Sequence, residues 1–227
     1  DGSTVSAVAD SGYTFSQWSD GVLASSRQDL SVNNNISVTA YFILVPEIPS
    51  DMVLIPAGVN SGTDPDFGAY ALTNAADFHM DKYEVTKAKW DEVYNWAVTN
   101  GYSFDNTGRG KATNHPVHTV NWYDCAKWCN ARSEMEGREP VYYVDDENLD
   151  PMVQRSMSWR PTLVKDSATG YRLPTAMQWE YAARGGVSSL RFPWGGDTIS
   201  HTQANYWSEE YGSPSFDVSP TLGFHPD

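Results

Sequence analysis

The stretch Tyr171–Gly186, YRLPTAMQWEYAARGG, decides which kind of fold to expect. Thr175 is followed three positions later by Gln178, and a Thr-x-x-Gln pair is a capping box that starts a helix. Apolar residues then recur at the spacing of one helix face, at Trp179, Ala182 and Ala183. The glycine pair at the end of the stretch favours helix termination. The stretch therefore predicts a short amphipathic helix.

Two further helices are expected upstream of this one. Thr86 is a candidate cap for a helix that ends at Asn100-Gly101, with an apolar face formed by Trp90, Val93, Tyr94 and Ala97. A second helix is expected from Asn121 through Gly137, with one stripe formed by Trp122, Cys125, Ala126 and Cys129. The runs MVLIPAG (52–58) and FHMDKYEV (78–85) are expected as strands. Short helices mixed with irregular strands and many turns favour an α+β fold over a parallel βαβ sheet.

The first 44 residues have a different character. The runs VSAVA, YTFSQW and ISVTAYF are rich in β-branched and aromatic residues, and polar, glycine-containing turns separate them. Pro46 and Pro49 then break any regular element. We therefore expect a partial all-β repeat module at 1–44, a linker at 45–50 and an α+β domain at 51–227.

Composition excludes several classes of function. The 227 residues carry 29 acidic against 15 basic side chains, a net charge of −14, so a polyanion such as nucleic acid is a poor partner. No run of eighteen apolar residues occurs, and no membrane span is expected. The opening DGSTVSAVAD has neither a basic nor an apolar region, so no signal peptide is expected in this chain.

The residues alone nominate no reaction. The two cysteines, Cys125 and Cys129, share a helix face and could hold a soft ion, but that face is also apolar, where a free cysteine is a small hydrophobe. Pairing with a cysteine outside this chain stays open. The acidic run Asp145–Asp150 is expected as a solvated loop. The loop-like stretch 201–217 offers oxygen ligands that suit Ca²⁺, from Asn205, Glu209, Glu210 and Asp217.

Seven stretches in this order resemble the formylglycine-generating enzyme (sulfatase-modifying factor) family over about residues 51–227. They are MVLIPAG (52–58), FHMDKYEVTKAKW (78–90), NHPVHTVNWYDCAKWCN (114–130), GYRLPTAMQWEYAARGG (170–186), RFPWGG (191–196), ANYW (204–207) and SPTLGFHPD (219–227). The segment GYTFSQWSDG with the later SVNNNISVTAYF resembles the internalin B-repeat-like modules of bacterial surface proteins.

The resemblance implies an irregular mixed fold related to C-type lectins and an extracytoplasmic bacterial protein. Members of the family oxidise the cysteine of a sulfatase C-x-P-x-R polypeptide to formylglycine, with O₂ and with copper held by a C-terminal cysteine pair. That pair should follow a G-N-V-W-E-W block, so the domain is expected to be truncated here. This chain then has no catalytic residue, and copper is expected only if the full-length protein has the pair. Cys129 matches a position that forms a structural disulfide in some members.

The resemblance also implies a structural Ca²⁺ ion. Asn205 of ANYW matches a calcium-ligating asparagine of the family, with the Tyr206 carbonyl beside it and Asp217 as a further oxygen ligand. Two functions follow as hypotheses. The full-length protein is a formylglycine-generating oxidase or a related one, or it is a non-catalytic, lectin-like module that binds a surface ligand or a protein.

Overall fold

A computed structural model describes residues 1–44, 48–144, 152–156, 158, 162–209 and 214–224. The chain divides into two compact units, 1–50 and 51–227. In the described ranges, no helix combines the length and the apolar composition that crossing a membrane requires. The acidic run 145–150 lies outside the described residues.

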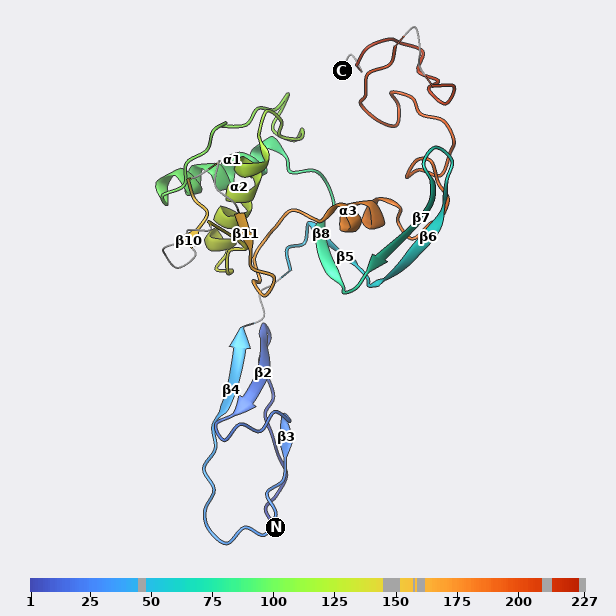
Figure 1. Ribbon diagram of the computed structural model, residues 1–227. Coiled ribbons are helices and arrows are strands. Elements are labelled where there is room, and N and C mark those ends of the chain that lie inside the picture. The colour runs from blue at the N-terminus through green and yellow to red at the C-terminus, as the bar shows by residue number, and fades with distance from the viewer. Residues whose placement is uncertain (45–47, 145–151, 157, 159–161, 210–213, 225–227) are drawn as a thin grey trace. The chain divides into compact units, whose positions relative to one another are not determined.

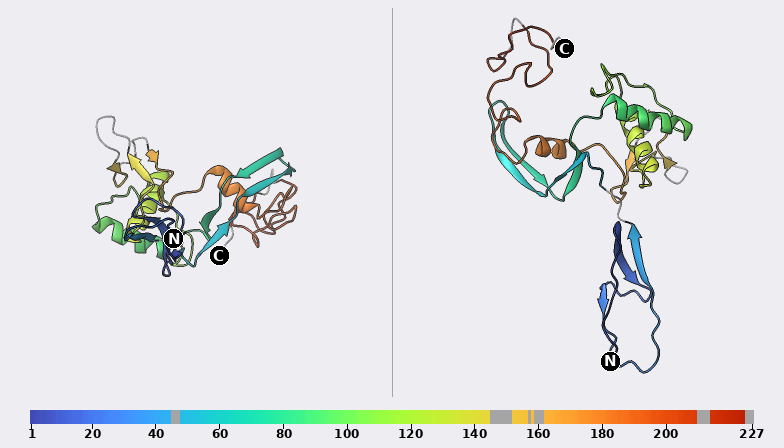
Figure 2. Two further views of the ribbon diagram at one scale, coloured as in Figure 1. Left: turned by 90° about the horizontal axis from the view of Figure 1, so that it is seen from below. Right: turned by 180° about the vertical axis from the view of Figure 1, so that it is seen from behind.

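The first unit is an all-β module of two antiparallel ribbons (Figure 1). β1 (Val5–Ser6) pairs with β3 (Ser26–Arg27), and β2 (Tyr13–Trp18) pairs with β4 (Ala40–Leu44). Figure 2 shows the β2–β4 ribbon again from behind. The anchor of this unit is Trp18, which is buried and donates from its indole Nε1 to the Ala24 carbonyl at 2.9 Å.

The strand expected at 13–18 is confirmed by β2, whereas the expected strand at 36–42 is wrong in its first half. β4 begins only at Ala40, and Thr39 before it makes two hydrogen bonds with Ser19. Its backbone N–H donates to Ser19 Oγ at 3.1 Å, and its carbonyl accepts from the Ser19 N–H at 2.8 Å.

The main core of the second unit lies between α1 (Lys87–Thr99) and α2 (Trp122–Met135), which run side by side in Figures 1 and 2. Trp90 and Trp128 stack with ring centroids 5.7 Å apart and planes inclined by 6°. The expected cap at Thr86 is confirmed, because Thr86 accepts from the Lys89 N–H. The second helix starts after Asn121 as expected, and Asn121 forms a capping box with Asp124 that was not predicted.

The helix α2 is buried nearly all round, which corrects the single apolar stripe expected for it. Trp122 is 48% exposed, whereas the charged Asp124, Lys127 and Arg132 are fully or almost fully buried. Buried charges are tolerated when they are paired. Lys127 Nζ lies 3.0 Å from Ser158 Oγ and 3.6 Å from Asp124 Oδ1. The buried ammonium of Lys127 is therefore paired with a carboxylate of its own helix and with a serine outside it.

A three-stranded antiparallel sheet packs beside α2. Its central strand is β9 (Tyr142–Val144), flanked by β10 (Met152–Val153) and β11 (Thr162–Val164). Asn130 of α2 holds the sheet, because its Nδ2 donates to the Tyr142 carbonyl at 2.7 Å and its Oδ1 accepts from the Val141 N–H at 3.1 Å.

Two antiparallel ribbons and a short helix form the rest of the regular structure. β5 (Met52–Ile55) pairs with β8 (Phe78–Asp81), which confirms the first four residues of each strand expected at 52–58 and 78–85. β6 (Gly58–Asp64) pairs with β7 (Gly68–Asn74). The helix α3 (Ala176–Ala183) lies against β7 (Figure 1). A Cβ at Gly62 would lie 2.6 Å from Ser189 Oγ, so glycine permits this close approach.

The capping box expected for α3 is confirmed, and its expected apolar face is not buried. Thr175 Oγ1 accepts from the Gln178 N–H at 3.1 Å, and Gln178 Oε1 accepts from the Thr175 N–H at 3.1 Å. No residue of the helix is buried, and Trp179 is 61% exposed. The capping box therefore explains where α3 starts. Burial of apolar side chains contributes little to the stability of this helix.

Candidate binding pocket and predicted ligand residues

The turn between β6 and β7 has an internally bonded carboxylate at its start. Asp64 Oδ1 accepts from the backbone N–H groups of Asp66 at 3.0 Å and Phe67 at 3.2 Å, and Gly68 adopts the left-handed conformation at φ 86°. These hydrogen bonds, together with Arg184, hold the pKa of Asp64 below its ordinary value of 3.8. The turn leaves Phe67 92% exposed at its tip.

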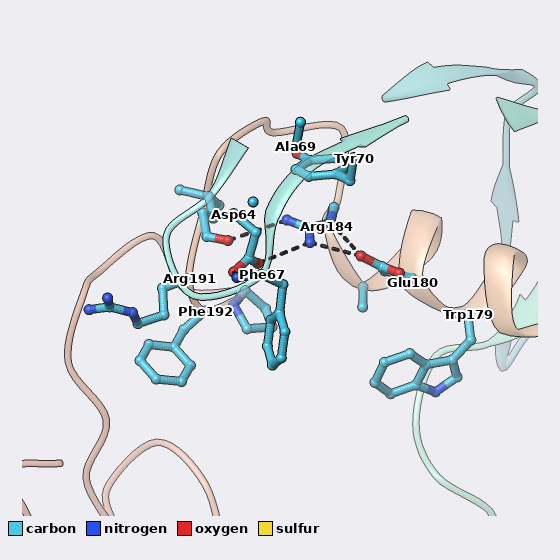
Figure 3. A pocket seen from close by; sticks show the side chains of 13 residues that line it. Asp64, Phe67, Ala69, Tyr70, Trp179, Glu180, Arg184, Arg191 and Phe192 are labelled. Carbon is cyan, nitrogen blue, oxygen red and sulfur yellow. Dashed lines mark hydrogen bonds and ion pairs between the residues drawn. The ribbon is translucent and has the colours of Figure 1, made fainter. Parts of the chain in front are cut away.

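The end of α3 supplies an arginine that meets this turn. Glu180 and Arg184 are four residues apart and therefore share a helix face, with Arg184 Nη2 at 2.8 Å from Glu180 Oε1. The same Nη2 lies 3.3 Å from Asp64 Oδ2, and the guanidinium carbon lies 3.8 Å from the centroid of the Tyr70 ring. Figure 3 shows Arg184 between the two carboxylates.

The segment that follows α3 completes the wall. The Leu190 carbonyl accepts from Arg184 Nη1 at 3.3 Å, and Arg191 forms a two-pronged pair with Asp66, at 2.8 and 3.1 Å. Phe192 stacks on Trp194 with centroids 5.0 Å apart. The turn, the helix and this segment together enclose a cavity of about 540 Å³.

The pocket was not foreseen in the sequence. Asp64 and Arg184 lie 120 positions apart, so no local spacing could pair them. The signals that were available are the turn-forming run D-P-D-F-G at 64–68, which presents a phenylalanine, and the i, i+4 pair of Glu180 and Arg184. Trp179 was assigned to the packing face of its helix, whereas it borders the pocket.

The residues predicted to hold calcium lie in one loop cluster. Tyr206 and Asp217 are in contact, because the Tyr206 hydroxyl donates to Asp217 Oδ1. Ser208 Oγ donates to Asp217 Oδ2 at 2.7 Å, and the Ser219 N–H donates to Oδ1 at 3.0 Å. These donors lower the pKa of Asp217 to about 2, the Tyr206 hydroxyl having the largest effect.

The oxygen chemistry of this cluster fits Ca²⁺, whereas protein donors use the same oxygen atoms. His201 Nε2 lies 3.1 Å from the Tyr206 carbonyl, and the Asn205 residue is exposed. Among the described residues, no three His, Cys, Asp or Glu side chains cluster as a metal site. Glu210, the other acidic residue of the expected loop beside Glu209, lies outside the described residues. A calcium ion that bound here would have to replace the hydrogen bonds that Asp217 and the Tyr206 carbonyl make in this structure. The calcium site stays a prediction.

Neither cysteine is suited to hold copper. Both are free thiols on α2, with Cys125 half-buried and Cys129 buried against the core. Burial raises the pKa of Cys129 to about 12 and also raises the pKa of Cys125, so both remain protonated at neutral pH. A copper(I) ligand is a thiolate. Forming a thiolate costs more free energy on this apolar helix face than in water, so these two residues are poor ligands for the ion, and no chemical step is assigned through it.

Two parts of the chain match known protein families. Residues 45–226 match the Sulfatase-modifying factor enzyme 1-like domain, and residues 1–46 match the Divergent InlB B-repeat domain. A protein named Chaperone protein LppX from Paenibacillus barcinonensis is 35% identical over 163 residues, covering 70% of this chain and 54% of that protein. Formylglycine-generating enzyme from Bos taurus is 31% identical over 189 residues, covering 73% of this chain and 48% of the enzyme.

A structural likeness is also found with a protein described as CarF. It has a TM-score of 0.49 and 26% identity, and it covers 66% of this chain and 62% of CarF. The chain spans about half the length of the curated relatives it matches, 54% of the first and 48% of the second.

Small antiparallel sheets, few helices in the described residues and long irregular connections define the second unit as a mixed α/β domain. Because residues 45–226 match the family model, the chain belongs to the sulfatase-modifying factor family. A divergent InlB B-repeat precedes that domain.

Proposed function

We propose that this chain is part of an extracytoplasmic bacterial protein whose full-length form oxidises the cysteine of a C-x-P-x-R polypeptide to formylglycine. The observation that carries the proposal is the family match over residues 45–226, together with the 31% identity to a formylglycine-generating enzyme. The InlB B-repeat match over residues 1–46 supports the extracytoplasmic location, because such repeats resemble bacterial surface modules.

The chain itself supplies scaffold rather than the redox centre. Its two cysteines lie on α2, with Cys125 half-buried and Cys129 buried, and burial makes them poor copper ligands. Copper, when bound to the full-length protein, would supply the activation of O₂. The 227 residues would contribute the core of α1 and α2. We therefore expect the chain alone to leave the thiol of a C-x-P-x-R peptide unchanged.

The experiment uses the longer protein that contains this chain. Two cysteines after a G-N-V-W-E-W block are expected in it, and Cu(I), O₂ and a C-x-P-x-R peptide should then yield the aldehyde, read by mass spectrometry. The 227-residue chain under the same conditions is the control. A longer protein that has the cysteine pair and leaves the thiol intact would refute the oxidation.

A non-catalytic, lectin-like binding module is the second candidate. It is favoured by the 35% identity to a protein named as a chaperone. Fold and activity separate readily within one family, so shared motifs identify the domain better than its reaction. Absence of a cysteine pair from the longer protein would leave this candidate and exclude the oxidase.

The proposal includes one structural Ca²⁺ ion held by Asn205, the Tyr206 carbonyl and Asp217. It is supported by the oxygen chemistry of these residues and by the lowered pKa of Asp217, which keeps its carboxylate ionised. Calcium prefers such carboxylate, carbonyl and amide oxygens, and it would stiffen a segment that has little regular structure. The ion has no role in the redox chemistry.

A further inference from the structure

The pocket between the β6–β7 turn and α3 presents flat apolar rings to solvent. Phe67 at the tip of the turn and Trp179 on α3 both line it, and they are among the most exposed large apolar side chains of the chain. In the view of Figure 3 the two rings stand apart, on either side of the Glu180 carboxylate. Exposed apolar surface that gathers around one cavity is typical of a binding site. The rings therefore offer flat contact surfaces to a ligand.

The polar floor of the pocket offers one hydrogen-bond acceptor. Asp64 uses both of its oxygens within the protein, Oδ1 with two backbone N–H groups and Oδ2 with Arg184. Glu180 accepts from Arg184 through Oε1 alone, and no donor among the described residues reaches its Oε2. The Glu180 side chain is partly exposed and lines the cavity, so a bound ligand can donate to this oxygen.

The same floor offers one hydrogen-bond donor. Arg184 Nη1 carries two hydrogens, of which one goes to the Leu190 carbonyl at 3.3 Å. Within the part of the chain that the structure describes, no acceptor takes the other. Its Nη2 is engaged by Asp64 and Glu180, and the guanidinium lies over the Tyr70 ring. These contacts hold the guanidinium in place, so the available donor and the available acceptor belong to one ion pair.

The charges of the lining favour a neutral ligand. Asp64 and Glu180 share the guanidinium of Arg184, so an anion would meet an excess of carboxylate. Arg191 is neutralised by its two bonds to Asp66. A cation could approach Glu180, but it would leave the N–H of Arg184 without an acceptor. A ligand with hydroxyl groups can satisfy both positions, because a hydroxyl donates as well as accepts.

We propose that this pocket binds a pyranose unit of a neutral carbohydrate. Two neighbouring sugar hydroxyls can donate to Glu180 Oε2 and accept from Arg184 Nη1. The C–H groups on one face of a pyranose contact the electron-rich face of an aromatic ring. The cavity of about 540 Å³ lies in the size range of small-molecule sites. The inference rests on neither the proposed oxidation nor the calcium site, and it names a ligand class for the binding-module candidate.

The test uses saturation-transfer NMR on the 227-residue chain in a buffer that contains EDTA. The probes are the methyl β-glycosides of glucose, galactose, mannose and N-acetylglucosamine. We expect at least one of them to bind, with saturation on its ring C–H protons. Sorbitol, which has the hydroxyls of a sugar without a ring face, should bind at least about tenfold more weakly, because it is flexible and cannot stack. The probes carry no thiol, so the result of the oxidation assay cannot alter this one.

Three variants locate the binding. Phe67→Ala and Trp179→Ala each remove an exposed ring without touching the core, and each should weaken the glycoside at least about threefold. Glu180→Met keeps the length of the side chain but removes the acceptor, and it should weaken the glycoside by a similar factor. The matched controls are Tyr83→Ala, an exposed ring outside the pocket lining, and Glu92→Met, an exposed glutamate of α1. Both controls should bind like the parent chain.

Several results would overturn the proposal. They are no binding of any of the four glycosides, equal affinity for sorbitol, and unchanged affinity in both Phe67→Ala and Trp179→Ala. Binding that occurs with added Ca²⁺ and disappears in EDTA would locate the sugar at a metal ion and not in this pocket. Weakening in Tyr83→Ala as large as in Trp179→Ala would show that exposed rings in general attract the sugar. Circular dichroism of each variant confirms that its fold is unchanged before binding is compared.

Discussion

The guanidinium of Arg132 lies over the ring of Tyr171, with its carbon 3.9 Å from the ring centroid. Arg132 is buried on α2, and Tyr171 opens the segment that leads into α3. The same guanidinium reaches Asp81 at the end of β8 and Glu136 at the end of α2, at 3.1 Å each. One side chain thus ties the helical core to a strand and to the start of the YRLPT segment.

Replacing Arg132 by Met should lower the free energy of unfolding by about 2–4 kcal/mol, because two carboxylates lose a buried partner. Arg155→Met is the matched control. Arg155 also lies over an aromatic ring, Tyr102 at 4.9 Å, and pairs with Glu134, but its side chain is 38% exposed against 2% for Arg132. It should cost about 1 kcal/mol or less. Urea unfolding measures both, and equal losses would show that burial is not the cause.

Gly170→Ala should destabilise the second unit strongly. A Cβ there would lie 2.2 Å from the Glu139 carbonyl oxygen and 2.5 Å from Ser133 Oγ, and the backbone oxygen cannot easily move. We expect a loss of at least about 2 kcal/mol in thermal or urea unfolding. Gly196→Ala is the control, since its nearest neighbour would lie at 3.8 Å, and its effect should stay within about 0.5 kcal/mol. A neutral Gly170→Ala would contradict the close packing of these loops.

The stability contributed by Asp64 should depend on pH. Its pKa in the folded chain lies below the ordinary 3.8, so its carboxylate stabilises the fold above that value. The contribution is lost as the pH falls from 3.8 through the lower folded pKa. Unfolding of the parent chain and of Asp64→Asn, compared at neutral pH and in acid, should show a gap that closes in acid. A gap that stays constant would refute the role of the charge.

The two thiols should differ in reactivity. Cys129 is buried with its pKa raised to about 12, so it should not react with a thiol reagent at neutral pH while the chain is folded. Cys125 is half-buried with a raised pKa and should react slowly. In concentrated guanidinium chloride both should react at the rate of a free thiol. Fast labelling of Cys129 in the folded chain would contradict its assignment to the core.

Removal of calcium tests the predicted ion. If Asn205, Tyr206 and Asp217 hold Ca²⁺, the melting temperature should rise with added Ca²⁺ and fall with EDTA, because the ion binds only the folded chain. Asp217→Asn should abolish this response. A melting temperature that EDTA leaves unchanged in the parent chain would exclude a stabilising ion. The hydrogen bonds from Tyr206 and Ser208 to Asp217 would then account for the loop by themselves.

Local patterns in the sequence predicted the elements whose causes are local. The predicted caps at Thr86 and Thr175 act over three residues, and both are observed. The burial of Lys127 could not be predicted, because its partner Ser158 is 31 positions away. The pocket was not predicted for the same reason, because Asp64 and Arg184 come into contact only in the folded chain. Trp179 looked like a core residue because spacing alone does not say which face has a neighbour.

The attachment of α3 has a consequence for local opening of the second unit. None of its residues is buried, and Arg184 at its end connects it to Asp64 through an ion pair. The helix is held by this ion pair, whereas α1 and α2 share a buried apolar core. The amides of α3 should therefore exchange with solvent well before those of α2. The part of the domain around α3 would then open in a separate step from the core of α1 and α2.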